Sequence, residues 1–181
     1  DEDFYIKNSG AKVLTGGEKG YTPVERVGGR PTLDVNGFTS GYSGEGVKTI
    51  LPSKAQVKIT SRLVPNQDPI KIFAGFEKYF AENANPGINW TLTLQDKANS
   101  AHSPRESEQV QAMAKALETV WGKKALYYRV GGSVPVVAEM QEILKTFSVI
   151  TGFGLPDDNI HSPNEKLSLP TWYKGIDALI H

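Results

Sequence analysis

Three short stretches in the first hundred residues alternate hydrophobic and polar positions, and each alternation predicts a β-strand with one buried face. The stretches cover residues 33–38, 57–63 and 88–94. After the second stretch, Asp68-Pro69 supplies an N-cap followed by a proline, and apolar residues at helical spacing continue to Phe80. This stripe predicts an amphipathic helix that packs on the sheet. Residues 1–30 are rich in glycine and lysine and are expected to form a loop or a hairpin arm.

The pattern changes after residue 98, where helices and strands begin to alternate. Ser103-Pro104-Arg105-Glu106 has the spacing of a capping box and predicts a helix that runs to Gly122. The pattern then predicts a strand at 125–130, a helix at 136–147, a strand at 148–153 and a helix at 169–180. We therefore expect an α/β protein with two domains. Residues 1–98 would form an α+β layer with a mainly antiparallel sheet, and residues 99–181 an α/β part.

Composition and charge narrow the classes of partner. Twenty basic and twenty acidic side chains cancel, so no net field attracts nucleic acid or a membrane surface. The chain has no cysteine, which excludes disulfides and thiol catalysis, so any metal must be bound by His, Asp or Glu. No apolar run reaches the roughly 18 residues that a membrane span needs. We expect a soluble, cytoplasmic protein, and because the chain starts at Asp1 we interpret it as a fragment.

A histidine close to two carboxylates is the first candidate site. Asp157, Asp158 and His161 follow a predicted strand, and imidazole and carboxylate groups on such a loop are typical ligands of a hydrolytic metal. The alternative is structural, because Ser162-Pro163-Asn164-Glu165 has the spacing of a capping box and could begin a helix. His102 precedes the same Ser-Pro-x-Glu pattern, which local capping alone can produce. The residues by themselves leave both interpretations open.

Two further groups could bind an anionic substrate. Gly131-Gly132-Ser133 follows a predicted strand, where backbone N–H groups and the Ser133 hydroxyl could approach a carboxylate, although the same residues also form ordinary turns. Arg62 lies at the end of a predicted strand, with Thr49 expected on the neighbouring one. A planar guanidinium can bind a peptide carboxylate through two hydrogen bonds, but arginines on the surface of strands are more common than substrate clamps.

Five sequence blocks, taken in order, resemble a known protein family. The blocks are Arg30–Gly37, Gly41–Pro52, Arg62–Pro69, Gly131–Pro135 and His161–Lys166. Their order resembles the zinc-dependent metallopeptidases that include carnosinase, aminoacylase and acetylornithine deacetylase. The dipeptidase and carnosinase branch is the most similar, and the resemblance extends over residues 18–181.

This resemblance implies a division of roles along the chain. Residues 1–98 would be the later part of a lid that also forms the homodimer interface, and residues 99–181 the C-terminal segment of the catalytic domain. His161 would be a ligand in a centre of two zinc ions. Gly132 and Ser133 would contact a peptide substrate near the metals, while Thr49 and Arg62 would reach it from the lid, with Arg62 holding its carboxylate.

Several elements of the family pattern are absent from the sequence. The family uses a His-x-Asp element, a bridging aspartate, a Glu-Glu pair that supplies the general base, and a His-Ser-Gly element in the lid, and none of these occurs here. We therefore expect no catalytic residue in this chain, and we expect the isolated chain to be inactive. An N-terminal catalytic fragment would complete the peptidase. The alternative is a non-catalytic dimerisation or assembly module.

Overall fold

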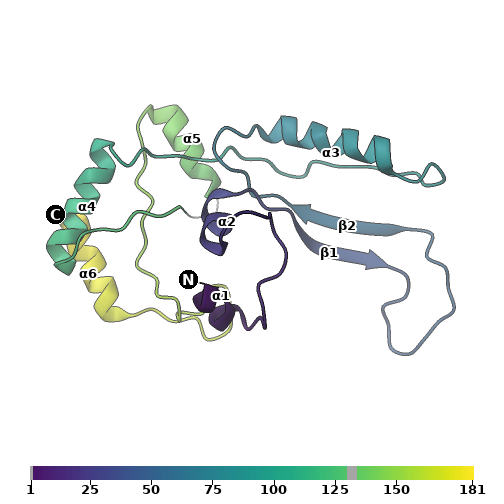
Figure 1. Ribbon diagram of the computed structural model, residues 1–181, viewed down its shortest axis with the longest axis horizontal. Coiled ribbons are helices and arrows are strands. Elements are labelled where there is room, and N and C mark those ends of the chain that lie inside the picture. Colours follow the sequence, from purple (N-terminus) through teal and green to yellow (C-terminus); the bar gives the residue numbers. More distant parts are fainter. Residues whose placement is uncertain (1, 130–133) are drawn as a thin grey trace. The chain divides into compact units, whose positions relative to one another are not determined.

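The computed structural model describes residues 2–129 and 134–181, which form two compact units. The first unit contains the described residues up to Ser100 together with Arg129 and Val134. The second contains residues 101–128 and 135–181. Helices combine with a small antiparallel sheet, which confirms the predicted mixture of helix and strand (Figure 1).

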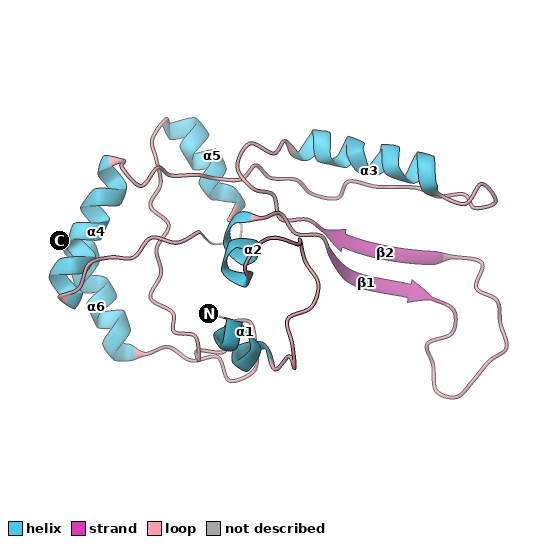
Figure 2. Ribbon diagram, viewed as in Figure 1, coloured by secondary structure: helices cyan, strands magenta, loops and turns pink. Residues whose placement is uncertain are grey.

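In the described residues, the first unit contains three helices and one hairpin, and the second unit contains three helices (Figure 2). In the first unit these are α1 (Glu2–Ser9), α2 (Pro23–Gly29), β1 (Asp34–Ser40), β2 (Ala55–Thr60) and α3 (Pro69–Asn83). In the second unit they are α4 (Glu108–Trp121), α5 (Pro135–Leu144) and α6 (Leu169–Ile180).

The hairpin keeps its hydrophobic residues on one face with the help of a β-bulge. Val35 lies opposite Ile59 and Phe38 opposite Val57, although Val35 and Phe38 are three residues apart. The register shifts between Val35 and Gly37, so one extra residue of β1 restores the alternation. The resulting face is open, since Phe38 is 69% exposed and Val35 62%.

The helix α3 begins where the sequence predicts. Asp68 is its N-cap and accepts hydrogen bonds from the backbone N–H groups of Ile70 and Lys71, and Pro69 occupies the first turn. The predicted apolar stripe is its less exposed side. Its closest aromatic contact is Phe80 with Trp90, at 5.7 Å between ring centroids. Among the described residues, the most extensive close contacts between elements join β1 to β2 and α4 to α6, and the packing of α3 on the sheet stays a prediction.

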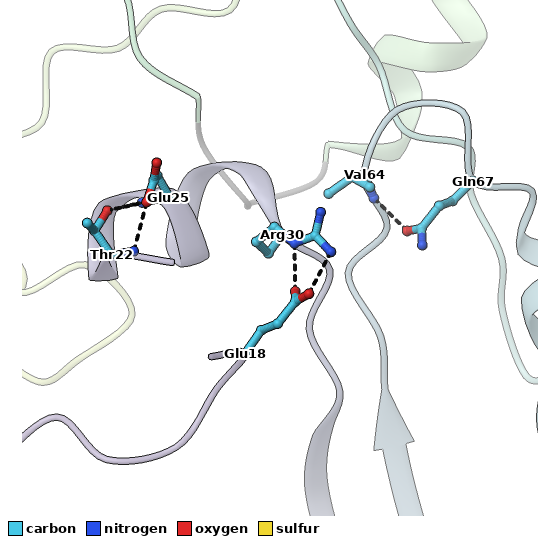
Figure 3. Close-up of polar contacts among 6 residues, drawn as sticks. All are labelled: Glu18, Thr22, Glu25, Arg30, Val64 and Gln67. Carbon is cyan, nitrogen blue, oxygen red and sulfur yellow. Dashed lines mark hydrogen bonds and ion pairs between the residues drawn. The ribbon is translucent and has the colours of Figure 1, made fainter. Parts of the chain in front are cut away.

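Residues 1–30 contain two short helices, so the predicted loop or hairpin arm was wrong. At the start of α2, the Thr22 side chain accepts from the Glu25 backbone N–H, and the Glu25 carboxylate accepts from the Thr22 backbone N–H (Figure 3). These reciprocal bonds form a capping box, which lowers the pKa of Glu25. Arg30 then forms two hydrogen bonds with Glu18, at 2.6 and 2.9 Å. Thr22 and Glu25 have the spacing of a capping box, and together with Pro23 they are a sequence signal for the start of this helix.

Three predicted strands are absent from the described residues. Residues 88–94, 125–129 and 148–153 contain no strand, although each has an apolar pattern. Only one hairpin is formed in the described parts of the chain, and no described neighbour forms a ladder with these three segments. A strand requires a partner for its backbone N–H and C=O groups, which explains why the pattern alone was insufficient.

The second unit is centred on the contact between α4 and α6. The buried small residues of these two helices are Ala116 in α4 and Gly175 and Ala178 in α6. Trp121 stacks on Phe153 with 5.8 Å between centroids and an interplanar angle of 3°. A side-chain carbon added at Gly175 would lie 2.5 Å from the Phe153 ring. Glycine at this position is therefore required by the packing.

Helix boundaries in the second unit follow local backbone geometry. The helix α4 begins at Glu108 and not at Ser103, whose hydroxyl instead donates to the carbonyl of Ser148, so the predicted capping box was wrong. It ends as predicted at Gly122, which has the left-handed φ of 67°. The helix α5 ends at Leu144, three residues earlier than predicted, because Lys145 has a φ of 51°. The helix α6 occupies the predicted range.

No helix in the described parts of the chain is both long and apolar enough to cross a bilayer.

Candidate metal and substrate site

His161 lies on a loop of irregular structure that runs from Leu155 to Lys166. It is exposed, and its φ of 63° places it in the left-handed region. Asn159 and Asn164 also have positive φ, at 55° and 60°. The Ser162 N–H donates to the Asn159 carbonyl at 2.9 Å, which folds the chain tightly around the histidine. The sequence Ser162–Glu165 therefore forms turns and caps no helix, so the structural alternative for this motif was wrong.

The two carboxylates before His161 do not join it in a metal cluster. Asp157 forms an ion pair with the Lys166 ammonium at 2.5 Å, and this hydrogen bond lowers the pKa of Asp157 and raises that of Lys166. Asp158 is 3% exposed, and its Oδ2 accepts from the Leu155 N–H at 2.6 Å. Residues 2–129 and 134–181 contain no group of three or more His, Cys, Asp or Glu side chains arranged to bind a metal ion.

His102 lies in the irregular segment before α4 and is exposed. The Ser103 hydroxyl beside it accepts from the Gln141 side chain at 2.9 Å while donating to Ser148. This serine therefore anchors the segment to two other parts of the second unit. The two similar His-Ser-Pro motifs of the sequence thus have different local structures, and neither begins a helix.

Arg62 follows β2, and a backbone hydrogen bond fixes its position relative to the hairpin. The Thr32 N–H donates to the Arg62 carbonyl at 3.0 Å, which continues the hairpin beyond its last ladder pair. Immediately after it, the Gln67 N–H donates to the Val64 carbonyl at 3.2 Å, and the Gln67 side chain accepts from the Val64 N–H (Figure 3). Asn66 has a φ of 69°, as a turn of this kind requires after proline.

Thr49 lies at the other end of the hairpin. It belongs to the exposed loop 41–54 that connects β1 to β2, and not to a strand as predicted. Arg62 lies beyond the far end of β2. A six-residue strand separates the two, which corresponds to roughly 20 Å of extended chain. Within this unit, the structure does not bring Thr49 and Arg62 together.

Gly132 and Ser133 lie outside the described residues. The neighbouring Arg129 is described, and its carbonyl oxygen would lie 2.6 Å from a side-chain carbon added at Gly28. The helix α2 therefore approaches the chain closely just before the Gly-Gly-Ser motif. One polar hollow of about 320 Å³ in the first unit is lined by Asn66, Gln67, Asp68, Asn99 and Ser100, and contains none of the predicted site residues.

His161 is the candidate metal ligand in this region. An imidazole is a common zinc ligand, and the side chain of His161 is exposed and of the right chemical type. Asp157 is engaged by Lys166 and Asp158 by the loop backbone. Sequence reasoning missed this second role of Asp158. The only available signal was its position after Leu155-Pro156-Asp157, where an aspartate side chain often bonds to the local backbone.

Comparisons with known proteins identify relatives for about four fifths of the chain. It is 30% identical over 153 residues to the Cys-Gly metallodipeptidase DUG1 of Saccharomyces cerevisiae, which covers 82% of this chain and 32% of that protein. It is 26% identical over 152 residues to human Beta-Ala-His dipeptidase, covering 80% of this chain and 29% of the relative. The chain thus spans about a third of the length of the curated relatives it matches.

A solved structure agrees with these relatives. The M20 family metallo-carboxypeptidase Sso-CP2 from Sulfolobus solfataricus superposes with a TM-score of 0.84 at 30% identity, over 98% of this chain and 40% of that one. The resemblance inferred from the five sequence blocks is confirmed. Because the model of peptidase family M20/M25/M40 matches residues 4–181, the chain belongs to this family.

Proposed function

We propose that this chain contributes one zinc ligand and part of the substrate pocket to a two-zinc peptidase that hydrolyses dipeptides or short peptides with a free carboxylate. The proposal is supported by its relatives, which are named as a Cys-Gly metallodipeptidase, a Beta-Ala-His dipeptidase and a metallo-carboxypeptidase. All three names describe cleavage of short peptides or of a peptide end that carries a carboxylate.

In this proposal His161 binds a zinc ion through its imidazole. When bound, zinc polarises a peptide carbonyl and makes water a better nucleophile at neutral pH. Arg62 holds the substrate carboxylate through its guanidinium, and Thr49 contacts the substrate from the β1–β2 loop. Gly132 and Ser133 contribute backbone and hydroxyl donors. The roles of these five residues are predictions from the family resemblance.

The observation that carries the proposal is the incomplete ligand set around His161. Within the described ranges, His161 belongs to no group of three or more His, Cys, Asp or Glu side chains that could bind a metal ion. A catalytic zinc usually has three protein ligands, and in this proposal the others come from elsewhere in the whole protein. We therefore propose that residues 1–98 belong to a lid that forms a homodimer, that residues 99–181 end the catalytic domain, and that an N-terminal catalytic part completes the site in the cytoplasm.

The test compares the 181-residue chain with the full-length protein. Zinc content and hydrolysis of Cys-Gly and β-Ala-His are measured for both. We expect the chain alone to show neither stoichiometric zinc nor turnover, and the full-length protein to show both. We expect His161→Ala in the full-length protein to abolish zinc-dependent turnover, whereas His102→Ala leaves it nearly unchanged. Turnover proportional to the pure chain would refute the proposal.

A non-catalytic assembly module is the second candidate. It is favoured by the open apolar face of the hairpin, where Val35 and Phe38 are largely exposed and Val57 is 46% exposed. Light scattering decides between the two functions when it is combined with the zinc assay. A stable oligomer of the full-length protein that binds no zinc and hydrolyses no dipeptide would favour the assembly module.

A further inference from the structure

The backbone around His161 adopts a conformation that its own residues do not favour. His161, Asn159 and Asn164 all have φ between 55° and 63°. Residues with side chains rarely adopt this region, although asparagine and histidine tolerate it better than most. Such conformations persist where surrounding interactions fix them. The contacts that close the loop from Leu155 to Lys166 can therefore fix this backbone.

Asp158 joins the beginning of this loop to its end. Its N–H donates to the Leu155 carbonyl at 3.1 Å, and its Oδ2 accepts from the Leu155 N–H at 2.6 Å. Its own carbonyl accepts from the Lys166 N–H at 2.9 Å. Three hydrogen bonds thus meet at one residue, one of them made by the side chain. At 3% exposed, Asp158 is the one buried charged residue in the described parts of the chain.

Burying the carboxylate of Asp158 costs more free energy than burying an apolar side chain of similar size. Its Oδ1 is buried without a hydrogen-bond partner among the described residues. A buried polar atom without a partner opposes folding, so a small apolar residue would pack here at lower cost. What an apolar side chain cannot do is accept the hydrogen bond from the Leu155 N–H. The specific contribution of Asp158 is therefore to fix the backbone.

The neighbouring Asp157 provides the contrast. Its side chain is 71% exposed, and it reaches Lys166 through an ion pair between two solvent-accessible groups. Ion pairs of this kind contribute little to stability because water screens them. The Asp157 side chain thus reaches the end of the loop through a screened surface pair, whereas the Asp158 side chain accepts a part-buried hydrogen bond from Leu155 at the beginning of the loop.

We propose that Asp158 is a positioning residue that closes the 155–166 loop and holds the backbone of His161 in the orientation that presents its imidazole to a metal ion. The proposal rests on the proposed function for the role of the imidazole. Asp158 touches neither metal nor substrate in this proposal and acts through the backbone from Leu155 to Lys166. Removing its side chain releases the Leu155 N–H, so the loop samples other conformations and the imidazole is presented less often.

The experiment uses the full-length protein with four variants: Asp158→Ala, Asp158→Asn, Asp157→Ala and His161→Ala. Hydrogen exchange of the 155–166 peptide is measured in the metal-free protein, and zinc affinity is measured by competition with a chelator. We expect Asp158→Ala to speed exchange of the loop amides and to weaken zinc binding by about tenfold or more, the range found when groups that orient a ligand are removed. Asp158→Asn keeps an oxygen acceptor and should restore most of both properties. Asp157→Ala should stay within about twofold of wild type.

The outcomes separate this proposal from the proposed function. Wild-type loop exchange and zinc affinity in Asp158→Ala, with zinc binding lost in His161→Ala, would overturn the positioning role alone. Equal effects of Asp157→Ala and Asp158→Ala would also overturn it, because the surface pair would then matter as much as the buried contact. Unchanged zinc affinity in His161→Ala would overturn the proposed function and the metal part of this proposal together.

Discussion

Replacing Gly175 by alanine tests the packing between α6 and the segment that carries Phe153. An alanine Cβ at this position would lie 2.5 Å from the Phe153 Cδ2 and 2.8 Å from Cε2. Carbon atoms in contact are usually about 3.5 Å apart or more, so the ring or the helix must move by roughly 1 Å. The ring cannot move freely, because it is stacked on Trp121.

Two opposing effects decide the magnitude. Alanine is a better helix former than glycine by about 1 kcal/mol, which stabilises the variant. Inserting a methyl group into a packed contact typically costs about 1–3 kcal/mol, and the stacked ring places this contact toward the upper end. We therefore expect Gly175→Ala to lower the free energy of unfolding by about 1–2 kcal/mol in total.

Gly75→Ala is the matched control. Gly75 also lies inside a helix, α3, but a side-chain carbon added there meets no atom within 4 Å. Only the helix-propensity effect remains, so we expect a gain of about 1 kcal/mol. Urea denaturation followed by far-UV circular dichroism measures both variants against wild type. A Gly175→Ala protein as stable as Gly75→Ala would refute the packing argument. In addition, Phe153→Leu should relieve part of the cost of Gly175→Ala in a double-mutant cycle.

Three further predictions concern other parts of the chain. Gly28→Ala should lower the free energy of unfolding by about 1–3 kcal/mol, because the alanine Cβ would lie 2.6 Å from the Arg129 carbonyl oxygen. At Gly29 an added Cβ meets no atom within 4 Å, so Gly29→Ala should be nearly neutral in the same urea assay. The hydrogen bonds from Thr22 lower the pKa of Glu25 in the folded protein. The stability that these hydrogen bonds give to α2 is therefore present above the pKa of Glu25 in the unfolded chain, and it is lost as the pH falls through the pKa of Glu25 in the folded protein. Stability measured from neutral pH to about pH 3 should therefore fall less steeply in Glu25→Gln than in wild type, and equal slopes would contradict the assignment. The pKa of Asp157 is also lowered, so any contribution of the Asp157–Lys166 ion pair to stability is likewise lost as the pH falls. Because both groups are exposed, Asp157→Ala should change the stability at neutral pH little. A large loss of stability in urea would show that the pair is stronger than its exposure implies.

Elements with strong local signals could be predicted from the sequence. Asp68-Pro69 and the apolar stripe after it predicted the start and the existence of α3, and Gly122 predicted the end of α4. The helix α6 also follows its pattern. Each of these signals acts through neighbouring residues, by capping, by helical spacing or by a left-handed φ, so no distant contact is needed.

Elements that depend on a partner could not be predicted in the same way. The segment 88–94 alternates as clearly as β2 does, but a ladder forms only where another strand lies beside it. The Ser103–Glu106 sequence has capping-box spacing, yet the Ser103 hydroxyl bonds to Ser148 instead. Local patterns of this kind are necessary for an element, and distant contacts determine whether it forms.

For the candidate site, the sequence by itself determined the family and the absence of His-x-Asp and Glu-Glu motifs from this chain, and it predicted His161 as a metal ligand. These follow from the order of side-chain types, which is fixed by the chain. Only the tertiary structure decided that Asp157 faces Lys166, that Asp158 is buried in the loop backbone, and that Thr49 and Arg62 lie at opposite ends of a hairpin. Burial and hydrogen-bond partners depend on which segments meet in space, and the spacing of residues along the chain does not specify that.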